Sequence, residues 1–254
     1  MAGIQMQILG SGTCVPSLER GSCSALVRGG GALILIDVGP GTMGRLLAAG
    51  VGIDEIDVIC LTHFHPDHCG ELAAFIFSSK YPVWERTKPL TLVGGAGVTE
   101  FWEKLGRVWG SNLEMPEGCF RVIELGDEGV VDLGFPGLGL AYGPVNHKPE
   151  SRAFRFTDGE GFSMVYSGDT DESPELEALA SGADVLVIEA STPDGEKAPG
   201  HLTPSLAGEI ARRAGVGQVV LTHIYPQCEG VDMVAQCRQK YPGPVRLARD
   251  LMMI

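Results

Sequence analysis

The chain has 254 residues, 44% of them hydrophobic, a length that suits one domain with a large core, and we expect a single domain over residues 1–254. Its formal net charge of −13 argues against a broad basic surface for nucleic acid, because that affinity comes mainly from Lys and Arg neutralising phosphates. The sequence has no run of about 18 apolar residues and no signal-peptide pattern, so we expect a cytoplasmic protein without membrane contact.

Short apolar runs rich in Val, Ile and Leu alternate along the chain with segments of helical spacing. The apolar runs predict buried strands at residues 32–36, 58–61, 162–166, 185–188 and 219–221. Helical spacing predicts helices at residues 42–49, 71–78, 98–109, 174–180, 204–214 and 231–240. Strand-rich stretches at 5–38 and 120–166 are interleaved with these units. The pattern predicts an α/β (α+β) class with two mixed β-sheets flanked by helices.

One loop and the cysteines give two further predictions. The segment 80–89 is the longest predicted loop, and we interpret its basic residues Lys80, Arg86 and Lys88 as a solvated loop or as part of a pocket rim. The seven cysteines form an odd set without a Cys-x-x-Cys pair. They predict reduced, mostly buried thiols and no disulfide framework.

A dense group of potential metal ligands follows the predicted strand 58–61. The chain there reads Thr62-His63-Phe64-His65-Pro66-Asp67-His68, with three imidazoles and a carboxylate in six positions. Histidine and carboxylate are ligands expected for zinc, and a loop leaving a strand can point several side chains into one pocket. We expect Pro66 to stiffen that loop. Each of the other histidines, His147, His201 and His223, follows an apolar run or lies in a Gly- or Pro-flanked loop.

The His-x-His-x-Asp-His run resembles the metallo-β-lactamase superfamily, with His147, Asp169 and His223 following in the same order. The resemblance implies a four-layer αββα sandwich with two divalent metal ions. One ion is expected on His63, His65 and His147, and the other on Asp67, His68 and His223. Asp169 and a hydroxide would bridge the two ions, and such a site keeps a net positive charge that suits an anionic phosphodiester.

The ligand types also bear on the metal and on the reaction. Imidazole and carboxylate donors favour zinc, although manganese, iron or nickel also suit them. Di-iron oxidoreductases of the superfamily carry glutamate where this chain has His65, so the resemblance implies hydrolysis. Asp67 is expected both as a ligand and in the catalytic set.

Segments 9–13, 36–42, 166–170 and 221–226 resemble the ribonuclease Z branch of the superfamily. That branch carries a glutamate-histidine pair, matched here by Glu189 and His201, which stabilises the transition state and protonates the leaving alkoxide. The alternative is that His201 caps the helix after it. Ser151 matches a serine that would hydrogen-bond a phosphate oxygen, or is a turn serine. Asp37 would orient a ligating imidazole, or caps the turn at its strand end.

One departure from that branch affects the substrate. His147 and Asp169 are only 22 positions apart, which leaves no room for the long Gly/Pro-rich arm with which ribonuclease Z grips tRNA. We therefore expect a phosphodiesterase acting on a small-molecule or cyclic phosphodiester. The alternatives are tRNA 3′ processing, hydrolysis of an ester, thioester, lactone or sulfate ester, and a non-enzymatic metal-binding module. The branch also implies a homodimer.

Overall fold

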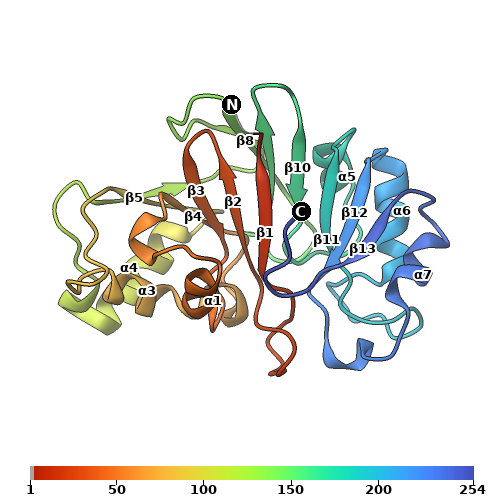
Figure 1. The fold of residues 1–254 in the computed structure, drawn as a ribbon, viewed down its shortest axis with the longest axis horizontal. Helices are drawn as coiled ribbons and strands as arrows, with labels where there is room; N and C mark the ends of the chain where they lie inside the picture. Colours follow the sequence, from red (N-terminus) through yellow and green to blue (C-terminus); the bar gives the residue numbers. More distant parts are fainter. Residues whose placement is uncertain (1–2) are drawn as a thin grey trace.

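The first β-sheet contains six strands in the order of the chain, β1 to β6 (Figure 1). The computed structural model describes residues 3–254. The strands are β1 Gln5–Gly10, β2 Ser24–Gly29, β3 Ala32–Ile36, β4 Val58–Leu61, β5 Leu90–Gly94 and β6 Phe120–Glu124. The pairs β1/β2 and β2/β3 are antiparallel, and the pairs from β3 to β6 are parallel. The sheet is therefore mixed.

The second β-sheet is also mixed, and again its antiparallel strands come first along the chain and its parallel strands last. Its order is β13-β12-β11-β10-β9-β8-β7. The strands are β7 Gly129–Val131, β8 Leu138–Pro144, β9 Arg152–Asp158, β10 Ser163–Tyr166, β11 Val185–Glu189, β12 Gln218–Thr222 and β13 Val245–Leu247. The pairs from β10 to β13 are parallel and the pairs from β7 to β10 are antiparallel. Consequently β8, β10, β11 and β12 all run in the same direction.

Helices cover the outer face of each sheet. On the first sheet lie α1 Thr42–Ala48, α3 Leu72–Ser78 and α4 Val98–Trp109, and the short α2 Pro66–Cys69 follows β4. On the second lie α5 Pro174–Ala180, α6 Pro204–Ala214 and α7 Met233–Arg238. Three 3-10 turns complete the elements: η1 Ile53–Glu55, η2 Gly110–Leu113 and η3 Pro226–Cys228. Figure 1 shows the two helical groups at opposite ends of the view, with the strands between them.

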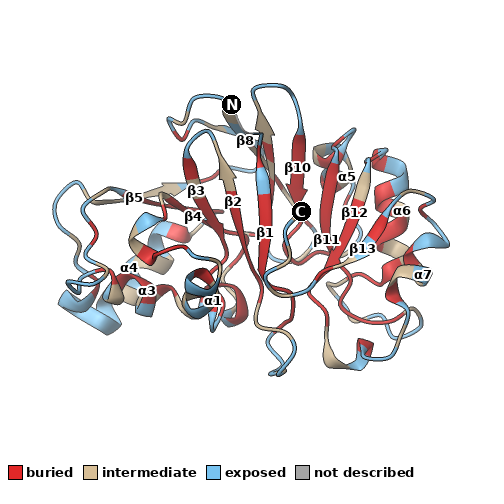
Figure 2. Cartoon of the chain, viewed as in Figure 1, coloured by how far each residue is buried: buried red, intermediate tan, exposed pale blue. Residues whose placement is uncertain are grey.

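Successive side chains of the central strands enter two different cores. In β12, Val219 and Leu221 pack with the helices of the second sheet, whereas Val220 packs between the two sheets with Ile34 and Phe156. Because both faces of these strands are covered, their sequences are continuous apolar runs without polar alternation. Figure 2 shows the strands as mostly buried and the helices as exposed on their outer sides. The structure thus has four layers, αββα.

The predicted fold class is confirmed, and the predicted helices 98–109, 174–180 and 204–214 have the observed bounds. One local expectation was wrong: the segment after His65 is not a loop but the helix α2, with Pro66 at its first position. Proline suits that position because its missing N–H has no helical partner there. All seven cysteines are free thiols. Across residues 3–254, none of the helices has the length and hydrophobicity needed to cross a bilayer.

The predicted loop at 80–89 is confirmed, but neither interpretation of its basic residues holds for Arg86. Arg86 is buried, and its guanidinium donates to the carbonyl oxygens of Ile53 and Ile56. Lys88 forms an ion pair with Asp57, which directly precedes β4. These contacts lie at the start of β4, whereas the histidine run follows its end. The segment therefore braces the far end of the first sheet instead of lining the histidine cluster.

Candidate metal centre

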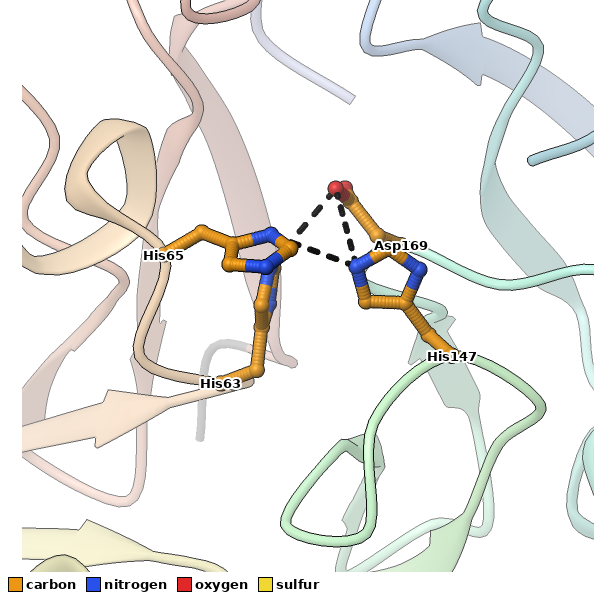
Figure 3. A group of neighbouring side chains, drawn as sticks. All are labelled: His63, His65, His147 and Asp169. Carbon is orange, nitrogen blue, oxygen red and sulfur yellow. Dashed lines mark hydrogen bonds and ion pairs between the residues drawn. The ribbon is translucent and has the colours of Figure 1, made fainter. Parts of the chain in front are cut away.

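The predicted ligands converge from the carboxyl ends of strands in both sheets. His63 follows β4, while His147, Asp169 and His223 follow β8, β10 and β12. The last three strands run in the same direction, so their ends share one edge of the second sheet. Figure 3 shows His63 and His65 approaching from the first sheet and His147 and Asp169 from the second. The two sheets thus close on one cluster.

Two of the turns that leave these strands have an unusual backbone. Asp37, after β3, and His223, after β12, have φ values of 60° and 59°, in the left-handed region that non-glycine residues seldom adopt. Such strain persists where surrounding contacts hold it, and it concentrates at functional sites. Here it turns each side chain towards the histidine cluster, where Asp37 meets His68 and His223 faces Asp169.

One group of donor atoms gathers around a single carboxylate oxygen of Asp169. The Oδ2 atom lies 3.7 Å from Nε2 of His63 and 3.9 Å from Nε2 of His147. His147 Nε2 is in turn 3.3 Å from Nδ1 of His65. One donor atom from each of these four residues lies within 4.8 Å of the others, a spacing that suits ligands of one shared cation.

A second group gathers around the other oxygen of the same carboxylate. Asp169 Oδ1 lies 3.2 Å from Nε2 of His68 and 3.3 Å from Nε2 of His223. Both of these nitrogens are 3.7 Å from Oδ2 of Asp67. Asp169 therefore presents one oxygen to each group, which is the arrangement of a carboxylate able to bridge two cations.

Several donor atoms in these groups lack any other partner. Nε2 of His63, His68 and His223 and Oδ1 of Asp169 are buried and have no hydrogen-bond partner among the described residues. A buried polar atom left unpaired costs about 1–3 kcal/mol, so four together need a compensating ligand. Imidazole nitrogens and carboxylate oxygens are donors for divalent transition metals. The residues present therefore fit a metal centre.

The opposite ring nitrogens are fixed by neighbours, which orients the rings. Nδ1 of His68 is 2.7 Å from Asp37 Oδ2, and Nδ1 of His147 is 3.0 Å from the carbonyl oxygen of Gly200. Nδ1 of His223 is 2.8 Å from the hydroxyl of Ser191. Partners of this kind set the tautomer and direction of ligating histidines.

Burial and charge also favour the ligating protonation states at two positions. Burial lowers the pKa of His63 to about 2, so this ring is the neutral form that binds a cation. Burial raises the pKa of Asp67, but the neighbouring imidazoles of His223 and His68 outweigh it and bring the value to about 2. Asp67 is therefore an ionised carboxylate at neutral pH.

Glu189 and His201 form a hydrogen-bonded pair beside the cluster. Glu189 is fully buried, and its Oε1 lies 3.0 Å from Nδ1 of His201. The His201 ring packs 5.4 Å from the His223 ring and 5.1 Å from the His147 ring, so it sits between the two donor groups. Burial lowers the pKa of His201, but the hydrogen bond and charge of Glu189 outweigh it, and the net shift is upward. The pair can hold a proton at the mouth of the centre.

The hydrogen bonds of this region decide one open alternative, that of His201, and show where Ser151 lies. His201 does not cap α6: its side chain bonds Glu189, and the first turn of α6 is held by Asp194, which accepts from the Ser205 N–H. Ser151 is buried, and its hydroxyl accepts from the Lys148 N–H in the turn after His147. Its role towards a phosphate oxygen stays a prediction.

Sequence reasoning missed Ser191. Its hydroxyl donates to Oε2 of Glu189 at 2.6 Å and lies 2.8 Å from Nδ1 of His223, so it joins the Glu189–His201 pair to a ligand of the second group. The only signal was its place two residues after Glu189, at the end of β11. The contact with His223 needs the pairing of β11 with β12, which brings the ends of both strands together.

The family model described as "Beta-lactamase superfamily domain" matches residues 33–224. A protein named ribonuclease Z from Mycobacterium sp. (strain KMS) is 30% identical over 275 residues, covering 98% of this chain and 94% of that protein.

Solved structures share the fold. The metallo-beta-lactamase fold protein YhfI from Bacillus subtilis superposes with a TM-score of 0.86 at 19% identity, covering 100% of this chain and 99% of that chain. A diphosphatase from the PhnP family superposes with a TM-score of 0.76 at 23% identity, covering 99% and 97%.

Proposed function

Because the chain belongs to the β-lactamase superfamily, we propose that it is a phosphodiesterase that holds two divalent cations, with zinc as the first choice of metal. The first cation would be held by His63, His65 and His147, the second by Asp67, His68 and His223, with Asp169 shared between them. Two such cations supply a water of lowered pKa and offset the charge on a phosphate.

The remaining chemistry belongs to the Glu189–His201 pair. When water attacks phosphorus and the bond to the leaving oxygen breaks, that oxygen needs a proton. His201 donates one from its ring and regains it from solvent, while Glu189 fixes the ring through Nδ1 and stabilises its charged form. This pair beside the cluster is the observation that carries the proposal, because an imidazole held by a buried carboxylate can supply the proton that a leaving alkoxide needs.

The substrate proposed is a small or cyclic phosphodiester. The region between His147 and Asp169 consists of a turn, β9, a tight turn at 159–162 and β10. Within it there is no extended arm that could reach across a folded RNA. The ribonuclease Z relative, aligned over 94% of its own length, favours tRNA 3′ processing as the second candidate.

The test compares two leaving groups in His201→Ala. With a cyclic nucleotide, whose leaving group is an alkoxide, turnover should fall by about 10²–10³-fold. With bis(p-nitrophenyl) phosphate the loss should be much smaller, because nitrophenolate needs no proton to depart. The metal content should equal that of the wild type. Loss of metal in the variant, or an equal loss of turnover with both substrates, would contradict the proposed role of His201.

A substrate panel on metal-analysed protein separates the candidate functions. It should contain cyclic nucleotides, aryl phosphodiesters, a tRNA precursor, thioesters, lactones and an aryl sulfate. Cleavage of the precursor at its 3′ end would favour the second candidate. Activity confined to carbonyl or sulfate substrates would overturn the phosphodiesterase, and a metal-loaded protein inert on the whole panel would indicate a binding module.

A further inference from the structure

A cavity of about 410 Å³ opens beside the metal centre and shares Asp67 with it. Its walls are the loop from Thr13 to Ser17, the segment from Arg20 to Ser22, Pro40, Arg45 and Pro66. A cavity of this size accommodates part of a nucleotide-sized molecule. Two guanidinium groups, those of Arg20 and Arg45, line it, and we call it the arginine pocket.

Arg45 is held rigidly in this pocket. Its Nε donates to Asp250 Oδ2 at 2.8 Å and its Nη1 donates to the carbonyl oxygen of Gly41 at 3.1 Å. The guanidinium lies against Gly21, where an added Cβ would be 2.0 Å from Cζ of Arg45. Only glycine at position 21 leaves room for this placement. The cation is thus fixed before any ligand arrives, and it loses little side-chain entropy on binding.

Arg20 brings a second positive charge with no carboxylate of its own. Its Nη1 donates to neutral acceptors, the Ser11 hydroxyl at 2.8 Å and the Ala248 carbonyl oxygen at 2.7 Å. Within residues 3–254 its guanidinium forms no ion pair, because Asp250 is paired with Arg45 and also accepts from the N–H groups of Ser11 and Gly21. Burial lowers the pKa of Arg20, which shows that its charge is partly removed from water.

The charges at the pocket are those of two arginines and two nearby carboxylates, Asp250 and Asp67. Asp250 forms the ion pair with Arg45 and also acts on the charge of Arg20, while Glu229 and Arg249 act on Arg20 with opposite signs. A partly desolvated guanidinium that forms no ion pair of its own among residues 3–254 is stabilised by an anion, and its planar shape matches the oxygens of a phosphate. Bound cations at the centre would offset the negative charge of Asp67 on the shared wall.

We propose that the arginine pocket binds a phosphate monoester carried by the substrate, in addition to the phosphodiester that is cleaved. This inference rests on the proposed function for the cleavage itself. It restricts the substrate class to phosphodiesters with a second, terminal phosphate on the same molecule. It also assigns Arg20 and Arg45 as specificity-determining residues that contact that second phosphate.

The test uses two substrates that differ by one phosphate. Thymidine 5′-(p-nitrophenyl phosphate) is compared with the same compound bearing a 3′-phosphate. The wild type should prefer the second compound in kcat/KM by about tenfold, the value of one charge-assisted contact. Arg20→Gln and Arg45→Gln should each abolish most of this ratio. Arg107 is an exposed arginine on α4, and Arg107→Gln serves as the matched control. This variant should keep the wild-type ratio of the two kcat/KM values.

Binding measurements separate failure of the pocket from failure of the proposed function. Calorimetry on the metal-loaded protein compares thymidine 3′,5′-bisphosphate, thymidine 5′-monophosphate and inorganic phosphate. Arg20→Gln is the preferred variant, since it leaves the Arg45–Asp250 ion pair in place, and its metal content and Tm verify folding. One outcome is that no diester is cleaved, but the wild type binds the bisphosphate more tightly than the monophosphate and Arg20→Gln loses this preference. That result would support the arginine pocket and contradict the phosphodiesterase function.

Two results would overturn the pocket itself. One is cleavage of both diesters with equal kcat/KM in the wild type. The other is that inorganic phosphate binds as tightly as the bisphosphate and that Arg20→Gln weakens both affinities equally. The pocket would then bind free phosphate and not a substituent of the substrate.

Discussion

The two β-sheets contribute to the proposed metal centre in different ways. The first sheet supplies His63, His65, Asp67 and His68 from one segment after β4, ending in the first turn of α2. The second sheet supplies His147, Asp169 and His223 from three separate turns, after β8, β10 and β12. One contribution depends on a short stretch of backbone, and the other on the mutual register of several strands. Asp169 is where the two meet, since its two oxygens face different donor groups.

The largest expected effect comes from removing that shared residue. In Asp169→Ala both donor groups lose their common carboxylate, so metal content should fall for both cations and turnover should drop by about 10³-fold or more. Asp67→Ala removes a donor from the second group only, and it should lose one metal and keep the other. Metal analysis per chain, with turnover on the same samples, distinguishes the two variants.

An Asp169→Ala protein that kept one full equivalent of metal would contradict the bridging role. A folded state is checked by circular dichroism and Tm.

The difference between the two contributions also decides how much of the site could be predicted from sequence. The run from His63 to His68 is recognisable because four potential ligands lie within six positions. His147, Asp169 and His223 were found through the resemblance, since a lone histidine or aspartate after a strand has no distinctive local pattern. Ser191 was missed because its contact with His223 exists only once β11 and β12 pair.

The fold shows the same division. Helices with clear starts and stops, such as α5 and α6 with proline at the first position, could be placed from sequence. Arg86 could not, because its acceptors are backbone carbonyls about thirty residues away. Helix α2 was missed because four residues are too few for a periodic pattern to appear.

Residues that orient ligands should have intermediate effects, and the two sheets provide a matched pair. Asp37 supports His68 from the first sheet through a carboxylate, and Ser191 supports His223 from the second through a hydroxyl. Asp37→Asn preserves shape, and asparagine tolerates the positive φ at this position. We expect affinity for the second cation to fall by about 10–100-fold, because the carboxylate no longer strengthens the His68 donor.

Ser191→Ala should cost less than Asp37→Asn, because a neutral hydrogen bond is weaker than a charge-assisted one. Titration of each variant with a competing chelator gives the affinities, and Ser191→Thr should restore the lost part. Equal affinities in Asp37→Asn and the wild type would show that Asp37 only caps its turn, where its oxygens also accept from Thr62.

The smallest expected effect concerns two helices, α4 on the first sheet and α5 on the second, whose first turns are stabilised differently. In the second half Ser173 begins α5 and accepts from the Leu176 N–H with its own side chain. In the first half α4 begins at Gly97, and its first N–H groups donate to Glu124, which lies on β6. A hydroxyl carries no charge, whereas a carboxylate at a helix start interacts with the helix dipole and can titrate.

This difference makes the stability contribution of Glu124 dependent on pH. Its hydrogen bonds from the Gly97 N–H and from Thr99 hold the pKa below the ordinary 4.5. A group with a depressed folded pKa stabilises the protein above its unfolded pKa, and this stabilisation is lost as the pH falls through the folded value. Glu124→Gln should therefore lower Tm by about 1–3 °C at pH 7 and by progressively less below pH 4.5.

Thermal melts of Glu124→Gln and the wild type are compared at each pH. Any loss of metal in acid affects the Tm of both proteins and therefore cancels in the difference. Ser173→Ala serves as the control, and its Tm deficit should change far less over the same range because the lost cap is a neutral hydroxyl. A deficit in Glu124→Gln that stayed constant down to pH 3 would mean that the glutamate acts through the shape of its side chain. The contrast between α4 and α5 would then lie only in where the capping residue stands in the sequence, on a distant strand for α4 and directly before the helix for α5.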